Sequence, residues 1–141
     1  MDENPKKLAM VVFSGTVDRL FPVGILASGA VAMGMDVEIF LTFWGLQAFA
    51  KRSQGMPPKF SVDYADMAPM FAQVLKEKNV PSPIETLRTA KQLGNVKIYA
   101  CTMTMDLLGQ TKDDFIDLVD GTAGVGEFMD RAKDAQTTLF I

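Results

Sequence analysis

The feature that most limits the possible folds is a set of short apolar runs that lack polar alternation. Residues 8–13, Leu-Ala-Met-Val-Val-Phe, contain no polar side chain, and residues 36–42 and 96–101 are mostly apolar. A strand of this kind needs cover on both faces, as strands have in parallel sheets. Segments with helical patterns separate the runs, so strands and helices alternate along the chain. The sequence therefore predicts an α/β fold with a largely parallel sheet.

Local signals indicate where several helices begin and end. The tetrapeptide Ser82-Pro83-Ile84-Glu85 is a capping box with proline at the first helical position, and it predicts a helix from about residue 83 to residue 94. The glycine-rich stretch 121–126 has the spacing G-x-x-G-x-G, which differs from known phosphate loops. We interpret it as a tight entry into a helix over residues 127–135, followed by a last strand over residues 136–141.

Residues 20–35 carry no charge, which makes a membrane span worth testing. The stretch has only 16 residues, contains three glycines and runs directly into acidic residues. Because a span needs roughly 20 apolar residues, we predict no transmembrane segment. A helix that is buried all round, in a sandwich or in an oligomer, accounts better for this composition.

Length and composition narrow the class of protein. With 141 residues, we assign residues 7–141 to a single domain and residues 1–6 to a disordered or extended N-terminus. The net charge is −3 and no extended basic run occurs, so we expect no nucleic-acid partner. One cysteine cannot form an intrachain disulfide, and the charged N-terminus does not look like a signal peptide, so we expect a cytoplasmic protein.

The single cysteine, Cys101, is the leading candidate for chemistry. It lies where the strand 96–101 meets a predicted short helix that ends near Gly109. Ligand crevices open at the carboxyl ends of strands in α/β sheets, and the free N–H groups of a following helix favour a thiolate. A free cysteine is also among the most buried residue types, so plain packing remains the alternative.

The absence of histidine restricts what this thiol can do. Cys–His nucleophile pairs and histidine-containing zinc sites are excluded. Two-cysteine peroxidase chemistry needs a resolving thiol that the chain lacks. A lone nucleophilic sulfur without a histidine base suits sulfur relay, in which a thiolate takes up a sulfane sulfur and passes it on.

Four further residues are predicted to line a ligand pocket from their loop positions alone: Thr16, Asp18, Trp44 and Met103. Each has a plainer alternative, since the loop after the first strand resembles an ordinary turn and Trp44 is as suited to packing. Cys101, Met103 and Met105 also offer three soft sulfur ligands that would suit Cu(I). In a helix these positions do not converge, so we predict no metal site.

The run Ile98-Tyr-Ala-Cys-Thr-Met-Thr-Met-Asp-Leu-Leu-Gly109 resembles the cysteine motif of the DsrE/DsrF-like family, in particular its DsrE2-type branch. Residues 30–37, 40–46, 76–80 and 139–141 resemble other blocks of that branch. The blocks occur in the same order and together cover nearly the whole chain.

The resemblance implies a three-layer α/β/α fold with a parallel sheet of about five strands. It also implies a homo-oligomer or hetero-oligomer, with sulfane sulfur carried on the matching cysteine, Cys101. Small sulfur-carrier proteins and rhodaneses are the partners that the family implies. Some members have a second cysteine, which this chain lacks, and some relatives are described as peroxiredoxin-like. No flavin or NAD fingerprint occurs here, so we expect no cofactor.

Three hypotheses follow. The first is a cytoplasmic, homo-oligomeric, sulfurtransferase-like carrier that takes sulfur from sulfane-sulfur donors onto Cys101 as a persulfide and passes it to another thiol. The second is a non-enzymatic oligomeric module that binds a small ligand or a partner and uses its cysteine for packing. The third is a Cu(I)-binding Cys/Met module.

Overall fold

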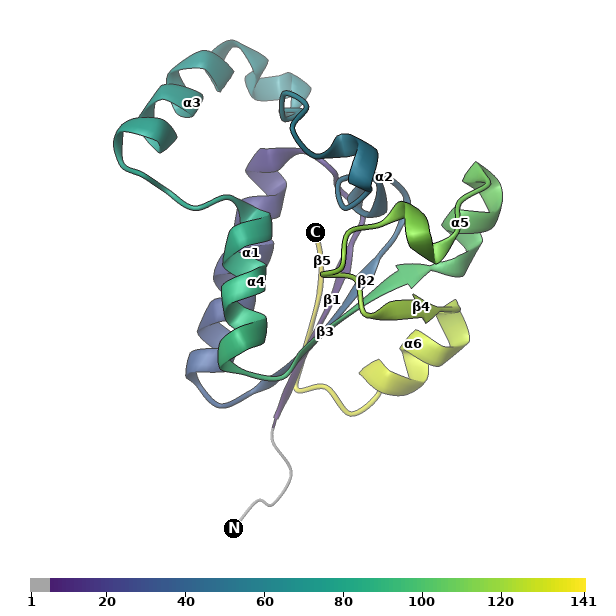
Figure 1. The fold of residues 1–141 in the computed structure, drawn as a ribbon. Helices are drawn as coiled ribbons and strands as arrows, with labels where there is room; N and C mark the ends of the chain where they lie inside the picture. Colours follow the sequence, from purple (N-terminus) through teal and green to yellow (C-terminus); the bar gives the residue numbers. More distant parts are fainter. Residues whose placement is uncertain (1–5) are drawn as a thin grey trace.

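A computed structural model describes residues 6–141, and it contains one five-stranded sheet (Figure 1). All strand pairs are parallel, in the order β4–β3–β2–β1–β5. The strands are β1 Lys7–Val12, β2 Asp36–Leu41, β3 Val96–Cys101, β4 Gly121–Ala123 and β5 Thr137–Phe140. The predicted parallel sheet is confirmed. Of the segment predicted to be disordered or extended, residues 1–5 lie outside the described residues.

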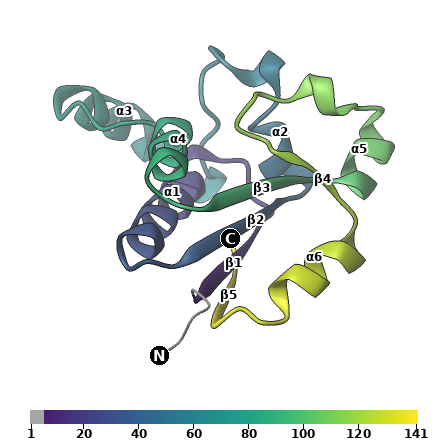
Figure 2. The same ribbon diagram turned by 60° about the horizontal axis from the view of Figure 1, so that its bottom comes forward.

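Helices cover both faces of the sheet, which confirms the predicted three-layer α/β/α arrangement. Helices α1 (Val17–Ala32) and α4 (Pro83–Leu93) lie side by side on one face, and α6 (Val125–Ala132) lies on the other (Figure 2). Two short helices follow the carboxyl ends of the central strands, α2 (Phe43–Gln47) after β2 and α5 (Thr102–Leu108) after β3. Short 3-10 turns occur at Lys51–Ser53, Val62–Met67 and Lys112–Asp114.

Most of the hydrophobic core lies between the sheet and the α1/α4 layer. Alternate residues of the strands face this layer, and Val12, Ile39 and Ile98 are fully buried there. Phe49 and Phe115 close the core near the carboxyl end of the sheet. Burial of large apolar side chains at about 1.5–3 kcal/mol each makes this core the main source of stability.

The α6 side of the sheet has a much smaller apolar cluster. It consists of Ala9, Phe40, Cys101, Ala123 and Phe128. The rings of Phe40 and Phe128 stack with their centroids 4.7 Å apart, which fixes α6 above the central strands.

Charged side chains supplement that small cluster. Arg131 of α6 lies 3.6 Å from the carboxylate of Glu38 on β2, and its guanidinium carbon is 4.6 Å from the centre of the Tyr99 ring. Lys7 of β1 approaches the same carboxylate at 3.8 Å. Because Glu38 is only 8% exposed, these two cations compensate a carboxylate that is largely removed from water.

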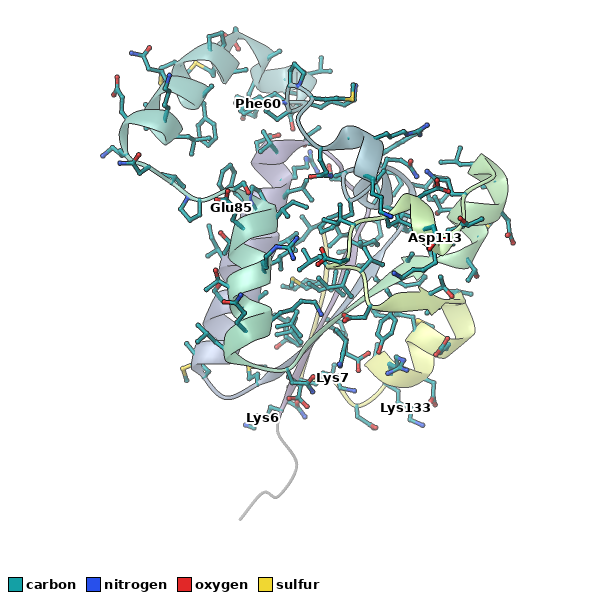
Figure 3. All side chains as sticks on the ribbon, in the orientation of Figure 1. Lys6, Lys7, Phe60, Glu85, Asp113 and Lys133 are labelled. Atoms are coloured by element: carbon teal, nitrogen blue, oxygen red, sulfur yellow. The ribbon has the colours of Figure 1, made fainter. Side chains whose placement is uncertain are left out.

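The predicted capping box is confirmed, and the predicted helix entry in the glycine-rich stretch is confirmed but incomplete. Ser82 and Glu85 form the capping box, and each side chain accepts a hydrogen bond of 3.1 Å from the other residue's backbone N–H (Glu85 is labelled in Figure 3). The glycine-rich stretch is not merely a helix entry, because its first three residues form strand β4 beside β3. Since β4 has only three residues, it is too short for a strand pattern to emerge.

The helix predicted for the uncharged stretch is α1. Its own chain does not bury it all round, so burial within a sandwich is wrong and burial in an oligomer stays a prediction. The helix begins at Val17, so Pro22 lies inside it, and only one side is buried, through residues such as Val23 and Ala27. Ile25 is 64% exposed and Met33 is 80% exposed, so in the single chain the helix is not buried all round. The sheet and α4 cover only one side of the helix. Within residues 6–141, no helix has the length and apolarity that crossing a bilayer requires.

The chain between α2 and α4 leaves the body as an arm that carries α3 (Ala68–Glu77) (Figure 1). No residue of α3 is buried. The arm touches α1 through Phe71, whose ring centroid lies 6.0 Å from that of Phe21 and 5.5 Å from that of Phe60 (labelled in Figure 3). An aromatic contact between α3 and α1 therefore helps to attach the arm to the body.

Candidate functional site

Cys101 is the last residue of β3 and the N-cap residue of α5. This is the strand-to-helix junction that the sequence predicts. The helix ends at Gly109, whose φ of +63° is the left-handed conformation typical of a helix stop. The side chain of Cys101 points to the α6 side of the sheet and is 6% exposed.

One side of this thiol is apolar. Phe40 of β2 and Phe128 of α6 belong to the same buried cluster, and Ala123 of β4 is the register partner of Cys101. Burial of this kind removes water from the sulfur and, taken alone, disfavours the thiolate.

The other side of the thiol is polar and comes from two neighbouring strand ends. Thr42, which follows β2, and Thr104, in the first turn of α5, have their hydroxyl oxygens 3.2 Å apart. The backbone N–H of Phe43 donates a hydrogen bond of 3.0 Å to the hydroxyl oxygen of Thr104. Thr104 is only 1% exposed, so its hydrogen bonds are shielded from water.

These polar groups determine the ionisation of Cys101. Burial raises its pKa, whereas the backbone N–H and hydroxyl of Thr104, the hydroxyl of Thr42 and the backbone N–H of Met103 lower it through hydrogen bonding. The hydrogen bonds outweigh the burial, so the pKa of Cys101 lies below the ordinary value of a free thiol. A buried cysteine in purely apolar surroundings would show the opposite shift.

The donor from Phe43 depends on an unusual backbone conformation. Phe43 has a φ of +47°, which for a residue of this size costs about 1–3 kcal/mol. Gly45 helps to hold the turn, because its N–H donates to the carbonyl of Phe13 at 2.8 Å. A Cβ at position 45 would come within 2.2 Å of the Val12 carbonyl oxygen, so only glycine allows this approach. The strained turn is thus fixed against β1.

The structure distributes the four predicted pocket residues over two places. Thr16 and Asp18 both contact Ser61 at the base of the arm. The carboxylate of Asp18 accepts a hydrogen bond of 3.1 Å from the backbone N–H of Ser61, and the hydroxyl oxygens of Thr16 and Ser61 lie 3.3 Å apart. Burial raises the pKa of Asp18, but hydrogen bonds from Ser61 and Thr16 outweigh it and leave the pKa lowered. Thr16 and Asp18 therefore fasten the arm to the start of α1.

Trp44 and Met103 lie nearer to the thiol. Met103 follows Cys101 by two residues and is 63% exposed, and Trp44 is the second residue of α2, after Phe43, and is 58% exposed. Ligand binding by Thr16, Asp18, Trp44 and Met103 stays a prediction. A hollow of about 290 Å³ lies at the far end of α5, near Asp113 (Figure 3), and its lining includes none of these residues and not Cys101.

Sequence reasoning missed Thr42 and Thr104, the two residues that most affect the thiol. Thr104 stands three residues after the N-cap residue Cys101, which is the spacing at which capping partners meet, so a signal was present. Thr42 is 62 residues from Thr104 in sequence, and only the adjacent positions of β2 and β3 bring the two together.

The Cu(I) hypothesis finds little geometric support. Met105 belongs to the core on the α1/α4 side, Met103 is exposed, and Cys101 belongs to the cluster on the opposite side of the sheet. The three sulfur atoms therefore lie in different surroundings. In the part of the chain that the structure describes, no group of three histidine, cysteine or acidic residues is arranged to hold a metal ion.

Comparison with known proteins identifies the family. The sequence matches the profile of the DsrE/DsrF/DrsH-like family over residues 4–72 and 59–140. The chain is a member of this family. It is 36% identical to the sulfur carrier protein DsrE2 of Allochromatium vinosum over an alignment of 158 positions, which covers 96% of this chain and 98% of that protein. The predicted resemblance to the DsrE2 branch is confirmed.

One further relative and one solved structure extend the comparison. The Bacillus subtilis protein YrkE is 34% identical over an alignment of 162 positions, which covers the whole of this chain and the whole of that protein. Among solved structures, protein MTH1491 of Methanobacterium thermoautotrophicum superposes with a TM-score of 0.60 at 14% identity, covering 96% of this chain and 99% of that one. At that identity the match supports the fold alone.

Proposed function

We propose that the protein is a sulfur carrier that holds sulfane sulfur as a persulfide on Cys101 and passes it to a thiol of another protein. The observation that carries this proposal is the polar cage around a buried sulfur, in which Thr42, Thr104 and backbone N–H groups lower the pKa of Cys101. The name of the Allochromatium vinosum relative, a sulfur carrier protein, supports the same role.

The proposed chemistry needs no histidine and no cofactor. With thiosulfate as donor, the Cys101 thiolate attacks the outer sulfur, a new S–S bond forms, the donor's S–S bond breaks, and sulfite leaves with the electron pair. A partner thiolate then attacks the outer sulfur of the persulfide and releases the Cys101 thiolate. A lowered thiol pKa helps both steps, because the thiolate is the nucleophile in the first and the leaving group in the second.

Partners and location form part of this proposal. The acceptor is a thiol on a small sulfur-carrier or rhodanese-type protein, and the protein works as a homo-oligomer in the cytoplasm, where thiols stay reduced. Because Cys101 is only 6% exposed, the donor must be slender or presented on a partner's flexible segment. Trp44 and Met103 are exposed and close in sequence to Thr42 and Cys101, and we assign their side chains to contact with the incoming group.

Mass spectrometry of the intact protein tests the carrier. After incubation with thiosulfate or a polysulfide, the wild type should gain the mass of a sulfur atom, and Cys101→Ala should gain none. Because sulfinic acid adds nearly the same mass, the gain must also be removed by cyanide, which takes up sulfane sulfur but does not reduce a sulfinate. Equal gain in both proteins, or gain in neither, would contradict the proposal.

The pH dependence of iodoacetamide labelling tests the mechanism and separates the carrier from a packing cysteine. The wild type should label at a pH below the free-thiol value of about 8.5, and Thr104→Val should shift the midpoint upward because it removes the hydroxyl donor. Leu107→Met is the matched control, since it alters an exposed side chain of α5 and leaves the thiol's donors in place. A midpoint at or above the free-thiol value would favour the non-enzymatic module.

A further inference from the structure

The outward side of α1 is an apolar stripe that nothing in residues 6–141 covers. Ile25 is 64% exposed, Leu26 is 38% exposed and Met33 is 80% exposed. No charged residue occurs from Leu20 to Met35, so the stripe is neutral along almost the whole helix. Contiguous exposed apolar patches of more than a few hundred Å² mark interaction sites in soluble proteins.

A groove accompanies this stripe. It runs between α1 and α4, which lie side by side in Figure 2, and has a volume of about 270 Å³. Small and apolar residues line it, namely Ser28, Val31, Ala32, Thr89, Ala90 and Leu93. The surface thus offers projecting side chains and, directly beside them, a hollow in which a projecting side chain can pack.

Gly29 lies at the middle of the stripe. A Cβ added there would have no atom within 4 Å, so the helix backbone is open to close approach from outside. Ile25 stands four residues before it, and Met33, the C-cap residue that ends α1, stands four residues after it along the same ridge. A two-fold axis brings a residue against its own copy, and glycine is the residue that lets two helix backbones meet there.

We propose that α1 packs antiparallel against α1 of a second copy of this chain, about a two-fold axis near Gly29. In this register Ile25 faces Met33 of the partner copy, and the large Leu26 faces the small Ala32. A parallel pair would place Leu26 against Leu26 and Ala32 against Ala32, which leaves one position crowded and the other empty. The antiparallel pair also opposes the two helix dipoles favourably.

The charge distribution favours a second copy over other occupants. A surface that binds nucleic acid or an anionic membrane presents lysine and arginine, and this stripe has neither between Leu20 and Met35. A neutral stripe meets its own copy without like-charge repulsion. It also lies on the opposite side of the sheet from Cys101, so the contact leaves the thiol free.

Charge exchange across the axis tests the proposal on the full chain. Sedimentation equilibrium should show a self-associating wild type, and Ile25→Glu or Met33→Lys alone should raise the dissociation constant by on the order of 100-fold. The double variant should recover association, because the new carboxylate at position 25 faces the new ammonium at position 33 of the partner copy. These positions are two turns apart within one helix, so they do not pair in the same chain.

Val62→Glu is the matched control, because Val62 is 90% exposed on the arm and far along the chain from the stripe. It should leave association unchanged, and circular dichroism should show native folding in all four variants. A monomeric wild type, an assembly indifferent to Ile25→Glu, one weakened equally by Val62→Glu, or a double variant that stays dissociated would each overturn the antiparallel contact. The rate of Cys101 labelling should be the same throughout and reports on the carrier proposal separately.

Discussion

The two faces of the sheet are built on different physical principles. Toward α1 and α4, the strands bury a broad apolar core in which Val12, Ile39 and Ile98 have no exposed surface. Toward α6, the buried apolar cluster has five residues, and the pair of Arg131 and Glu38 supplements it. Cys101 belongs to this second face.

The difference indicates how the fold accommodates a polar cage. A thiolate needs N–H and O–H donors close by, and such groups cost stability when they lie in a broad hydrocarbon core. The small α6 face leaves room for Thr42 and Thr104 at its carboxyl end while the opposite face provides most of the folding energy. The residues that contribute most to stability and the residues of the proposed chemistry therefore lie on opposite faces of the sheet.

The largest effect should come from two substitutions on β3 that truncate side chains on opposite faces. Ile98→Ala removes a fully buried side chain from the main core and should lower the free energy of unfolding by about 3 kcal/mol. Cys101→Ala, three residues along the same strand, should cost about 1 kcal/mol, because it removes a single atom from a small cluster. Urea denaturation measures the free energy of unfolding of both variants. Equal losses of stability would contradict the idea that the α1/α4 face contributes more to stability than the α6 face.

A smaller effect should distinguish the two carboxylates near Arg131. Arg131→Met keeps the apolar stem but leaves the buried Glu38 carboxylate with Lys7 alone, and should cost about 2 kcal/mol. Glu127→Gln removes the other partner of Arg131, whose side chain is 51% exposed, and should change stability by no more than about 0.5 kcal/mol. Thermal denaturation of the two variants provides the comparison; a larger loss in Glu127→Gln would mean that the exposed pair, and not Glu38, holds α6.

The smallest effect should be a pH dependence that belongs to Cys101. Because its pKa is lowered in the folded protein, the unfolded chain binds more protons between that pKa and the free-thiol value of about 8.5. The stability that the thiolate contributes is fully present above the free-thiol value and is lost as the pH falls through the folded pKa. Under reducing conditions, the wild type should therefore gain stability relative to Cys101→Ala as the pH rises toward 9. Parallel pH profiles for the two proteins would rule out a thiolate stabilised by the fold.

Much of the fold could be predicted because its signals are local. The capping box at Ser82 and Glu85 and the junction at Cys101 both lie within a few consecutive residues. The exposed stripe of α1 could not be predicted from its composition, since an uncharged helix has the same sequence pattern whether its own chain or a neighbouring chain covers it. The polar groups around the thiol could not be predicted either, because only the pairing of β2 with β3 brings Thr42 close to Cys101.

The left-handed backbone of Phe43 bears on how readily the sulfur can change its charge. In water, a newly formed anion is stabilised only after surrounding dipoles have turned toward it, and that reorientation adds to the barrier of a reaction. Here the Phe43 N–H already donates a hydrogen bond to the hydroxyl oxygen of Thr104. The hydroxyl hydrogen of Thr104 therefore points away from that N–H before the thiol loses its proton. The free-energy cost of the Phe43 conformation arises once, during folding. In each later cycle of sulfur loading and release, the hydrogen-bonding groups around the sulfur are already oriented.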